Sequence, residues 1–153
     1  MVQNAAQILH KNRAKSLCNL PIAISFRFVY NKDNKRKEIQ KMDYIKGSVV
    51  WVNFGEAVGS EQGKTRPAVI VSCDSNNRNS STITVVPFTS KIKKGFLPCH
   101  FVLGNVNGLV GDNMALAEQI RTVDKLRINN YVGHLTKEQV KGVDKAVLAH
   151  LGL

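Results

Sequence analysis

The sequence has neither a cysteine framework nor a long run of apolar residues. Its three cysteines, Cys18, Cys73 and Cys99, stand at spacings that match neither a disulfide scaffold nor a metal-binding motif. A scattered set of this kind indicates a reducing, cytoplasmic environment, and we expect each thiol to be a small buried side chain. No apolar run is long enough to cross a membrane, although a targeting peptide at the basic N-terminus stays open as an alternative.

The sequence also lacks the motifs of metal-dependent, phosphate-binding and serine-nucleophile enzymes. Its four histidines are scattered, with no two at the spacing of metal ligands, and neither a P-loop nor a nucleophile elbow is present. We therefore expect no metal and no cofactor, so that any chemistry is metal-free. His100 and His134 stay open as an acid–base pair, as in some ribonucleases, but a structural role is the preferred interpretation of both.

Positive charge is abundant and unevenly distributed. The net charge is +11, and residues 1–41 contain 9 of the 22 basic residues but only 2 of the 11 acidic ones. Basic surfaces attract polyanions, most often nucleic acids, although the smaller excess in the rest of the chain does not by itself identify a nucleic-acid binder. We interpret residues 1–41 as a basic extension, either disordered or an artefact of the assigned start, because a complete domain begins at Met42. A genuine lineage-specific extension is the alternative.

Residues 42–153 are predicted to form one domain of the α+β class. Runs rich in β-branched and apolar residues predict strands at 48–54, 67–73, 82–88, 99–103 and 114–122. The second run is apolar throughout, which is typical of a strand buried on both faces. Asp74–Ser81 has the composition of a turn, and Asn129–Tyr131 is predicted to be irregular.

A helix is predicted near the C-terminal end of the sequence. Thr136, followed three residues later by Gln139, has the pattern of a capping box. The apolar residues that follow recur at helical spacing on one face: Val140, Val143, Val147 and Leu151. A strongly curved sheet that carries this helix would be an SH3-like β-barrel with added helices.

The connection Gly59–Pro67, with the sequence GSEQGKTRP, is unusually polar for a link between two strands. Gly59 and Gly63 allow positive φ angles and a close approach of a ligand to the backbone. Lys64 and Arg66 supply positive charge, and the planar guanidinium of Arg66 can bind one phosphate with two donors. This composition indicates an anion-binding loop, most simply for a phosphodiester. A solvated hairpin loop whose Arg66 pairs with a surface carboxylate is the alternative.

RNA is a suitable substrate for metal-free chemistry because it carries its own nucleophile, the 2′-hydroxyl beside the scissile phosphate. An enzyme must remove that proton, neutralise the pentacoordinate phosphorane and protonate the leaving 5′-oxygen. An arginine and a hydroxyl group can do much of this. Since arginine keeps its charge in most settings, it serves better as an electrostatic clamp than as a base.

Six stretches of the sequence carry a specific pattern: KGSVVWVNF, VGSEQGKTRPAVIVS, VVPFTSKIKK, LPCHF, LAEQIRTVDKLR and GHLT. In this order they resemble the MazF/PemK family of toxin endoribonucleases from toxin–antitoxin modules, particularly its Gram-positive branch. The resemblance implies an SH3-like barrel with added helices that works as a homodimer. It also implies metal-independent cleavage of single-stranded RNA at short sequences, leaving 2′,3′-cyclic phosphate and 5′-hydroxyl ends.

The resemblance places the family's catalytic arginine on Arg66 and its catalytic threonine on Thr89, in the stretch PFTSK. Arg66 would be the main acid–base and charge-stabilising group, and Thr89 would hold the phosphate through its hydroxyl. The residues expected to bind RNA are Ser60, Gln62, Lys64, Glu118 and Gln119.

Simpler roles remain for several of these residues. Thr89 would otherwise be a turn residue at a strand end, and Glu118 would form an ion pair with Arg121. Arg121 and Arg127 are interpreted as internal scaffolding.

The basic segment Lys91–Lys94 joins Lys64–Arg66 as the expected path of the RNA backbone.

The resemblance implies a cognate antitoxin as partner, an acidic and partly disordered chain that lies across the dimer groove and covers the catalytic loop. The alternative function is that of a non-catalytic toxin of the CcdB type, which shares the fold and binds gyrase. The presence of Arg66 together with Thr89 favours the nuclease.

Overall fold

The computed structural model describes residues 44–92 and 97–153; the proposed extension, residues 1–41, and the proposed start at Met42 lie outside these ranges. The strands are β1 (Ser48–Asn53), β2 (Thr65–Ile70), β3 (Thr82–Thr89), β4 (His100–Asn105), β5 (Asp112–Leu116), β6 (Arg121–Asp124) and β7 (Ile128–His134). The helices are α1 (Asp74–Asn79) and α2 (Lys137–Leu151), with the 3₁₀ turns η1 (Ala117–Gln119) and η2 (Lys125–Arg127). No helix in the described ranges is long and apolar enough to cross a membrane.

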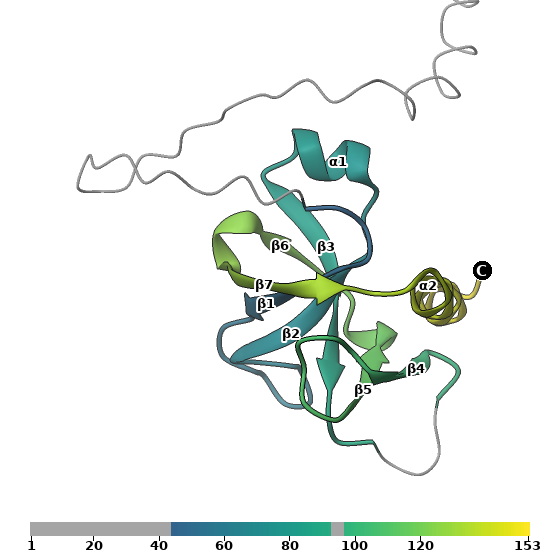
Figure 1. The fold of residues 1–153 in the computed structure, drawn as a ribbon. Coiled ribbons are helices and arrows are strands. Elements are labelled where there is room, and N and C mark those ends of the chain that lie inside the picture. Colours follow the sequence, from purple (N-terminus) through teal and green to yellow (C-terminus); the bar gives the residue numbers. More distant parts are fainter. Residues whose placement is uncertain (1–43, 93–96) are drawn as a thin grey trace, which may run out of the picture. The chain divides into compact units, whose positions relative to one another are not determined.

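The seven strands form one antiparallel sheet that branches at β3 (Figure 1). The strand order is β4-β5-β3-β2-β1-β7, and β6 pairs with β3 off this path. The first half of β3 pairs with β6, whereas its last two residues, Phe88 and Thr89, pair with β5. Strand β3 therefore holds two parts of the sheet together, and Thr89 is its last residue, in the part that pairs with β5.

Alternate residues of the central strands face two separate apolar clusters. Val49, Val69 and Val86 belong to one cluster, which also contains Val143 of α2. Their sequence neighbours, Val50 among them, belong to the other cluster, which includes residues of β6. Because successive strand residues point to opposite faces, these strands are buried on both sides, as the apolar run of β2 predicted. Figure 1 shows α2 on one side of the sheet.

The predicted capping box at the start of α2 is confirmed. The hydroxyl of Thr136 accepts a hydrogen bond from the Gln139 amide at 3.2 Å, and the Gln139 side chain accepts one from the Thr136 amide at 2.9 Å. Gln139 also donates to the Leu103 carbonyl at 2.9 Å and so ties the helix to β4. The predicted apolar stripe is correct at Val143, which is buried, and wrong at Leu151, which is 56% exposed.

The prediction of a turn at 74–81 is wrong, because Asp74–Asn79 form the short helix α1. Its sequence, DSNNRN, favours helix poorly, since such side chains compete for the backbone. Tertiary hydrogen bonds compensate: the Asp74 carboxylate accepts from the Lys46 amide at 2.7 Å, and the buried Asn77 bonds with Ser72. Cys73 immediately precedes this helix and is exposed, so its predicted burial is also wrong.

Two predictions for the second half of the chain need correction. The single strand predicted at 114–122 is divided into β5 and β6 by the 3₁₀ turn η1. The segment 129–131, predicted to be irregular, lies inside β7. Its pairing with β1 contains two register shifts, and such bulges let a strand accommodate polar residues that do not alternate regularly.

We predict that Thr136→Ala lowers the free energy of unfolding by about 1 kcal/mol, because the Gln139 amide loses its acceptor at the first turn of α2. Urea denaturation followed by circular dichroism measures this change. Thr136→Ser is the matched control, since it keeps the accepting oxygen and should retain most of the stability. Equal losses in the two variants would mean that the threonine methyl group, and not the cap, is responsible.

Candidate functional site

The loop between β1 and β2, residues 54–64, is closed at its neck by two backbone hydrogen bonds. The Phe54 amide donates to the Lys64 carbonyl at 2.9 Å, and the Lys64 amide donates to the Gly55 carbonyl at 2.6 Å. Lys64 itself has a φ of 61°, and no other non-glycine residue in the described ranges has a positive φ. A lysine held in this region indicates that the surrounding structure fixes the backbone just before Arg66.

The two glycines of this loop serve different purposes. Gly59 has a φ of 58° and open space around it, as expected for a residue that needs a left-handed backbone. Gly63 does not have a positive φ, so this part of the prediction is wrong. It is buried instead, and a Cβ atom there would lie 2.6 Å from the backbone nitrogen of Ala57. Gly63 is thus required because no side chain fits.

Arg66, at the start of β2, is half-buried and directed by its own loop. Its Nε donates to the Gly63 carbonyl at 3.0 Å. Among the described residues no carboxylate forms an ion pair with Arg66, so the alternative of a surface salt bridge is not observed there. The Nε contact fixes the side chain while the two Nη groups keep donors for an external anion, such as a phosphate.

Thr89, the last residue of β3, lies on the strand next to Arg66. The β2–β3 ladder pairs Ala68 with Pro87, and the same register continued by two residues sets Arg66 opposite Thr89. By alternation both side chains belong to the face of the sheet that carries Ala68. The Thr89 hydroxyl accepts a hydrogen bond from the Lys91 amide at 3.1 Å, which leaves its proton available for another acceptor.

A hollow of about 390 Å³, here called the η1 hollow, lies beside the same loop. Its lining residues are Phe54, Glu61, Gln62, Glu118, Gln119, Ile120 and Arg121. The hollow brings together three of the residues predicted to bind RNA, Gln62, Glu118 and Gln119, from distant parts of the sequence. Ser60, Lys64, Arg66 and Thr89 do not line it.

Gln119 connects η1 to the loop by two hydrogen bonds. Its side-chain oxygen accepts from the Gln62 amide at 3.2 Å, and its side-chain nitrogen donates to the Ser60 carbonyl at 3.5 Å. Arg121 supports the same loop, since its Nη1 donates to the Phe54 carbonyl at 3.3 Å. Arg127 donates in the same way to the Asn53 carbonyl at 3.2 Å. Both arginines thus support backbone carbonyls, as a scaffolding role requires, but they are exposed, so the prediction that they are internal is wrong.

Two acceptor atoms at the η1 hollow are buried without a hydrogen-bond partner in the described residues: Gln62 Oε1 and Glu118 Oε2. A buried acceptor without a partner costs stability, and proteins retain few of them. Both residues line the hollow, so a ligand that donates hydrogen bonds there, such as a nucleobase amino group or a ribose hydroxyl, would satisfy them.

Glu118 pairs with His100 rather than with Arg121. His100 Nε2 lies 3.1 Å from Glu118 Oε1, while His100 Nδ1 accepts from the Leu97 amide at 3.4 Å, which indicates that the ring proton is on Nε2. His134 instead contacts the Lys46 and Leu135 carbonyls at 3.0 and 2.7 Å. Each histidine thus has structural partners of its own, which supports the preferred interpretation over an acid–base pair.

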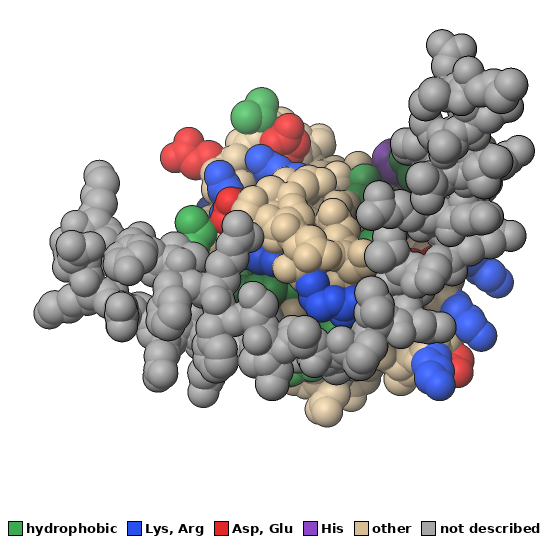
Figure 2. Space-filling view, turned by 90° about the horizontal axis from the view of Figure 1, so that it is seen from above, with side chains coloured by type: hydrophobic (Ala, Val, Ile, Leu, Met, Phe, Trp, Pro, Cys, Tyr) green, Lys and Arg blue, Asp and Glu red, His purple; other side chains and the backbone are tan. Residues whose placement is uncertain are grey.

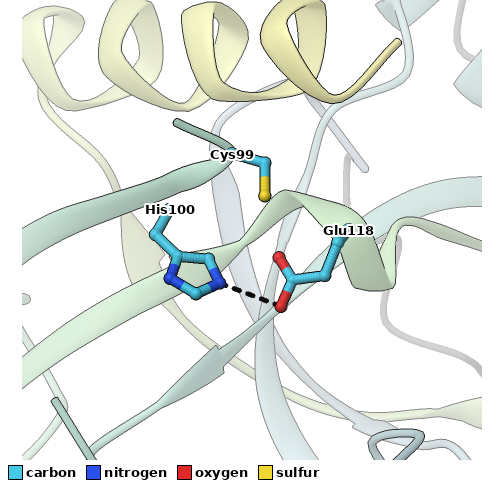
Figure 3. Close-up of side chains that lie close together, drawn as sticks. All are labelled: Cys99, His100 and Glu118. Atoms are coloured by element: carbon cyan, nitrogen blue, oxygen red, sulfur yellow. Dashed lines mark hydrogen bonds and ion pairs between the residues drawn. The ribbon is translucent and has the colours of Figure 1, made fainter. Parts of the chain in front are cut away.

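Cys99 lies beside this hydrogen-bonded pair and was not expected there. The side chains of Cys99, His100 and Glu118 converge, as Figure 3 shows, although Cys99 and His100 are separated from Glu118 by eighteen or more residues. Desolvation raises the pKa of the half-buried Cys99 thiol, and the nearby Glu118 carboxylate raises it further. No spacing in the sequence indicates this cluster, because tertiary pairing of β4 with β5 creates it.

Basic side chains do not gather at one place on the face that Figure 2 shows. Lys and Arg lie at several separate places there, and acidic side chains lie near some of them. Of the basic segment Lys91–Lys94, residues 93 and 94 lie outside the described ranges.

The comparisons with known proteins agree on one family. A family model described as "PemK-like, MazF-like toxin of type II toxin-antitoxin system" matches residues 45–151. The endoribonuclease EndoA of Bacillus subtilis (strain 168) is 38% identical over 109 residues, which cover 71% of this chain and 94% of EndoA.

Solved structures lead to the same family. A crystal structure of MazF from Deinococcus radiodurans superimposes with a TM-score of 0.61 at 28% identity, covering 71% of this chain and 96% of that chain. A MazE–MazF structure from the same organism has a TM-score of 0.60 at 26% identity, covering 74% of this chain and 99% of that chain.

We predict that Gly63→Ala disorders the β1–β2 loop, because the added Cβ would collide with the backbone of Ala57. Hydrogen exchange of the Lys64 amide, which bonds to Gly55, should accelerate by roughly tenfold or more. Gly59→Ala is the matched control: it strains a positive φ but meets open space, so its exchange should change less. Equal acceleration in both variants would show that crowding at Gly63 does not hold the loop.

Proposed function

Because the chain belongs to the family of PemK-like, MazF-like toxins of type II toxin–antitoxin systems, we propose that it is a sequence-specific endoribonuclease. It cuts single-stranded RNA with its own side chains, leaving 2′,3′-cyclic phosphate and 5′-hydroxyl ends. The relative EndoA, an endoribonuclease by name, supports this assignment. The observation that supports it is the position of Arg66, which is held by one contact to Gly63 on a strand that pairs with β3, the strand that ends at Thr89.

The proposed reaction is an in-line attack of the 2′-oxygen on the adjacent phosphorus, which breaks the bond to the 5′-oxygen. Arg66 donates from its Nη groups to the non-bridging oxygens, where negative charge accumulates in the transition state. The Thr89 hydroxyl donates to the same phosphate and fixes its position. Water takes the 2′-proton and returns a proton to the leaving 5′-oxygen, while the Arg66 guanidinium stays protonated and stabilises the charge on the phosphate between them.

The η1 hollow would select the RNA sequence. Gln62 and Glu118 present acceptors to the amino groups and hydroxyls of a nucleotide, while Gln119 holds the loop that carries Ser60. Lys64 lies between this loop and Arg66, where its charge attracts the RNA backbone. In single-stranded RNA the base edges are free, so such contacts read sequence without opening a duplex.

The proposal includes the assembly in which the enzyme works. The chain forms a homodimer in the cytoplasm, its sheet closes as an SH3-like barrel, and a cognate antitoxin inhibits it. The MazE–MazF structure from Deinococcus radiodurans supports an antitoxin partner. The match covers 99% of the chain in that structure, at 26% sequence identity.

We predict that Arg66→Ala reduces RNA cleavage by about 10²–10³-fold, the usual effect of removing one transition-state donor. The full chain and the variant are incubated with a long RNA in excess EDTA, and the new ends are mapped. Discrete cuts with 5′-hydroxyl ends are expected from the full chain. Arg78→Ala is the matched control, because Arg78 is an exposed arginine on α1, away from the loop.

Cleavage by Arg66→Ala at the rate of the control would refute the catalytic role of this residue. If the folded full chain cuts no RNA at all, the nuclease assignment itself fails, and binding to gyrase becomes the function to test. Thr89→Ser adds a second comparison: it keeps the hydroxyl and should retain more activity than Thr89→Ala.

We predict a steep salt dependence of RNA affinity. Each phosphate contact to a single strand contributes a slope of about −0.7 in a plot of log affinity against log salt concentration. Lys64→Ala should make the slope shallower by about that amount, whereas Lys137→Ala, at an exposed position on α2, should not. Fluorescence anisotropy with a 2′-O-methyl RNA measures binding without cleavage. An affinity that does not respond to salt would remove Lys64 from the path of the RNA.

A further inference from the structure

Three side chains of different chemistry converge at the start of β4. The Cys99 sulfur, one ring nitrogen of His100 and one carboxylate oxygen of Glu118 all lie within 4.8 Å of one another (Figure 3). Cys99 ends the turn before β4, His100 is the first residue of β4, and Glu118 comes from η1. Pairing of β4 with β5 holds these two segments together, since His100 lies opposite Leu116.

This set of donors matches the ligands that proteins use for zinc. Thiolate, imidazole and carboxylate each bind Zn²⁺, and three protein ligands with one open position are typical of sites that exchange the metal or a fourth ligand. With zinc bonds of about 2.0–2.3 Å, the donors of a tetrahedral site lie roughly 3.3–3.8 Å apart. The observed spacing requires side-chain movements of only about 1 Å.

One oxygen of the cluster is free to act as a metal ligand. Glu118 Oε2 is buried without a hydrogen-bond partner in the described residues, although a carboxylate is among the costliest groups to leave unsatisfied. A divalent cation bound between these side chains would take this carboxylate oxygen as a ligand and so satisfy it.

His100 can adapt to such an ion. Its Nε2 faces Glu118, so a metal there takes the place of the ring proton, which moves to Nδ1. Moving the proton to Nδ1 breaks the hydrogen bond from the Leu97 amide to that atom. This bond is 3.4 Å long and therefore weak.

We propose that Cys99, His100 and Glu118 form a Zn²⁺-binding site. Zinc bound there inhibits the protein, because it withdraws Glu118 from the η1 hollow. The second half of this proposal rests on the proposed function. Glu118 is common to both sites, since it lines the hollow and belongs to the cluster. With a thiolate and a carboxylate as ligands, the zinc-bound site has no net charge, so it is not a positive centre that would attract RNA.

Metal binding is tested with Co²⁺ as a spectroscopic probe for the full chain under reducing conditions. Ligation by Cys99 is expected to give a thiolate-to-cobalt charge-transfer band in the near ultraviolet, which Zn²⁺ abolishes. Cys99→Ser and His100→Gln should lose this band or weaken cobalt affinity by more than about tenfold. Cys73→Ser is the matched control and should keep it, because Cys73 is an exposed free thiol outside the cluster. Circular dichroism verifies that each variant is folded.

A band that persists in Cys99→Ser, or one that Cys73→Ser removes, would overturn the site. So would the absence of any band in the folded full chain. These readouts do not depend on RNA cleavage, so they stand even if the nuclease assignment is wrong.

Inhibition is tested by cleavage assays with Zn²⁺ added and then removed by EDTA. The full chain should lose about tenfold or more of its cleavage rate with zinc and recover it with EDTA. Cys99→Ser should cleave equally well with and without zinc, whereas Cys73→Ser should be inhibited like the full chain. Zinc that binds without slowing cleavage, or that slows Cys99→Ser equally, would overturn the inhibitory role. A chain that is inactive in EDTA from the outset contradicts the proposed function instead.

Discussion

The hydrogen bonds between Gln119 and the β1–β2 loop are the contacts on which the site depends. They join a loop near the start of the domain to a 3₁₀ turn near its end, and both sides of the η1 hollow rest on them. Because ordering a loop of this length loses much conformational entropy, the loop needs hydrogen bonds of this kind to keep one shape. Arg121 adds a second brace at the Phe54 carbonyl, so that the backbone before Arg66 is fixed from two directions.

Much of the fold follows from the sequence. The runs of β-branched residues located β1, β2, β3 and β4 to within a few residues, because continuous apolar patterns allow few alternatives. The cap at Thr136 was also recognisable, since it depends only on residues three apart. Failures occurred where tertiary contacts outweigh local preference. Helix α1 is held by Lys46 and Ser72 from other segments, and the register shifts of β7 depend on its partner β1.

The candidate site, like the fold, could be predicted from the sequence only in part. Arg66 and the polar loop around it stand out by composition, and the resemblance supplied Thr89, Gln62 and Glu118. What no spacing in the sequence indicates is that Glu118 meets His100 and Cys99, because β4 and β5 must first pair to bring them together. Gly63 illustrates a subtler case. A glycine in a loop suggests backbone freedom, but here it serves close packing against Ala57.

The branching of the sheet at β3 has a consequence for the time at which the protein becomes active in a cell. Arg66 and Thr89 emerge early from the ribosome, but the end of β3 pairs with β5, and the loop of Arg66 rests on η1. Neither support exists until residues up to about 121 have been synthesised. Under the proposed function, the nascent chain therefore cannot cut RNA through most of its translation, which leaves time for an inhibitor to be present when it folds.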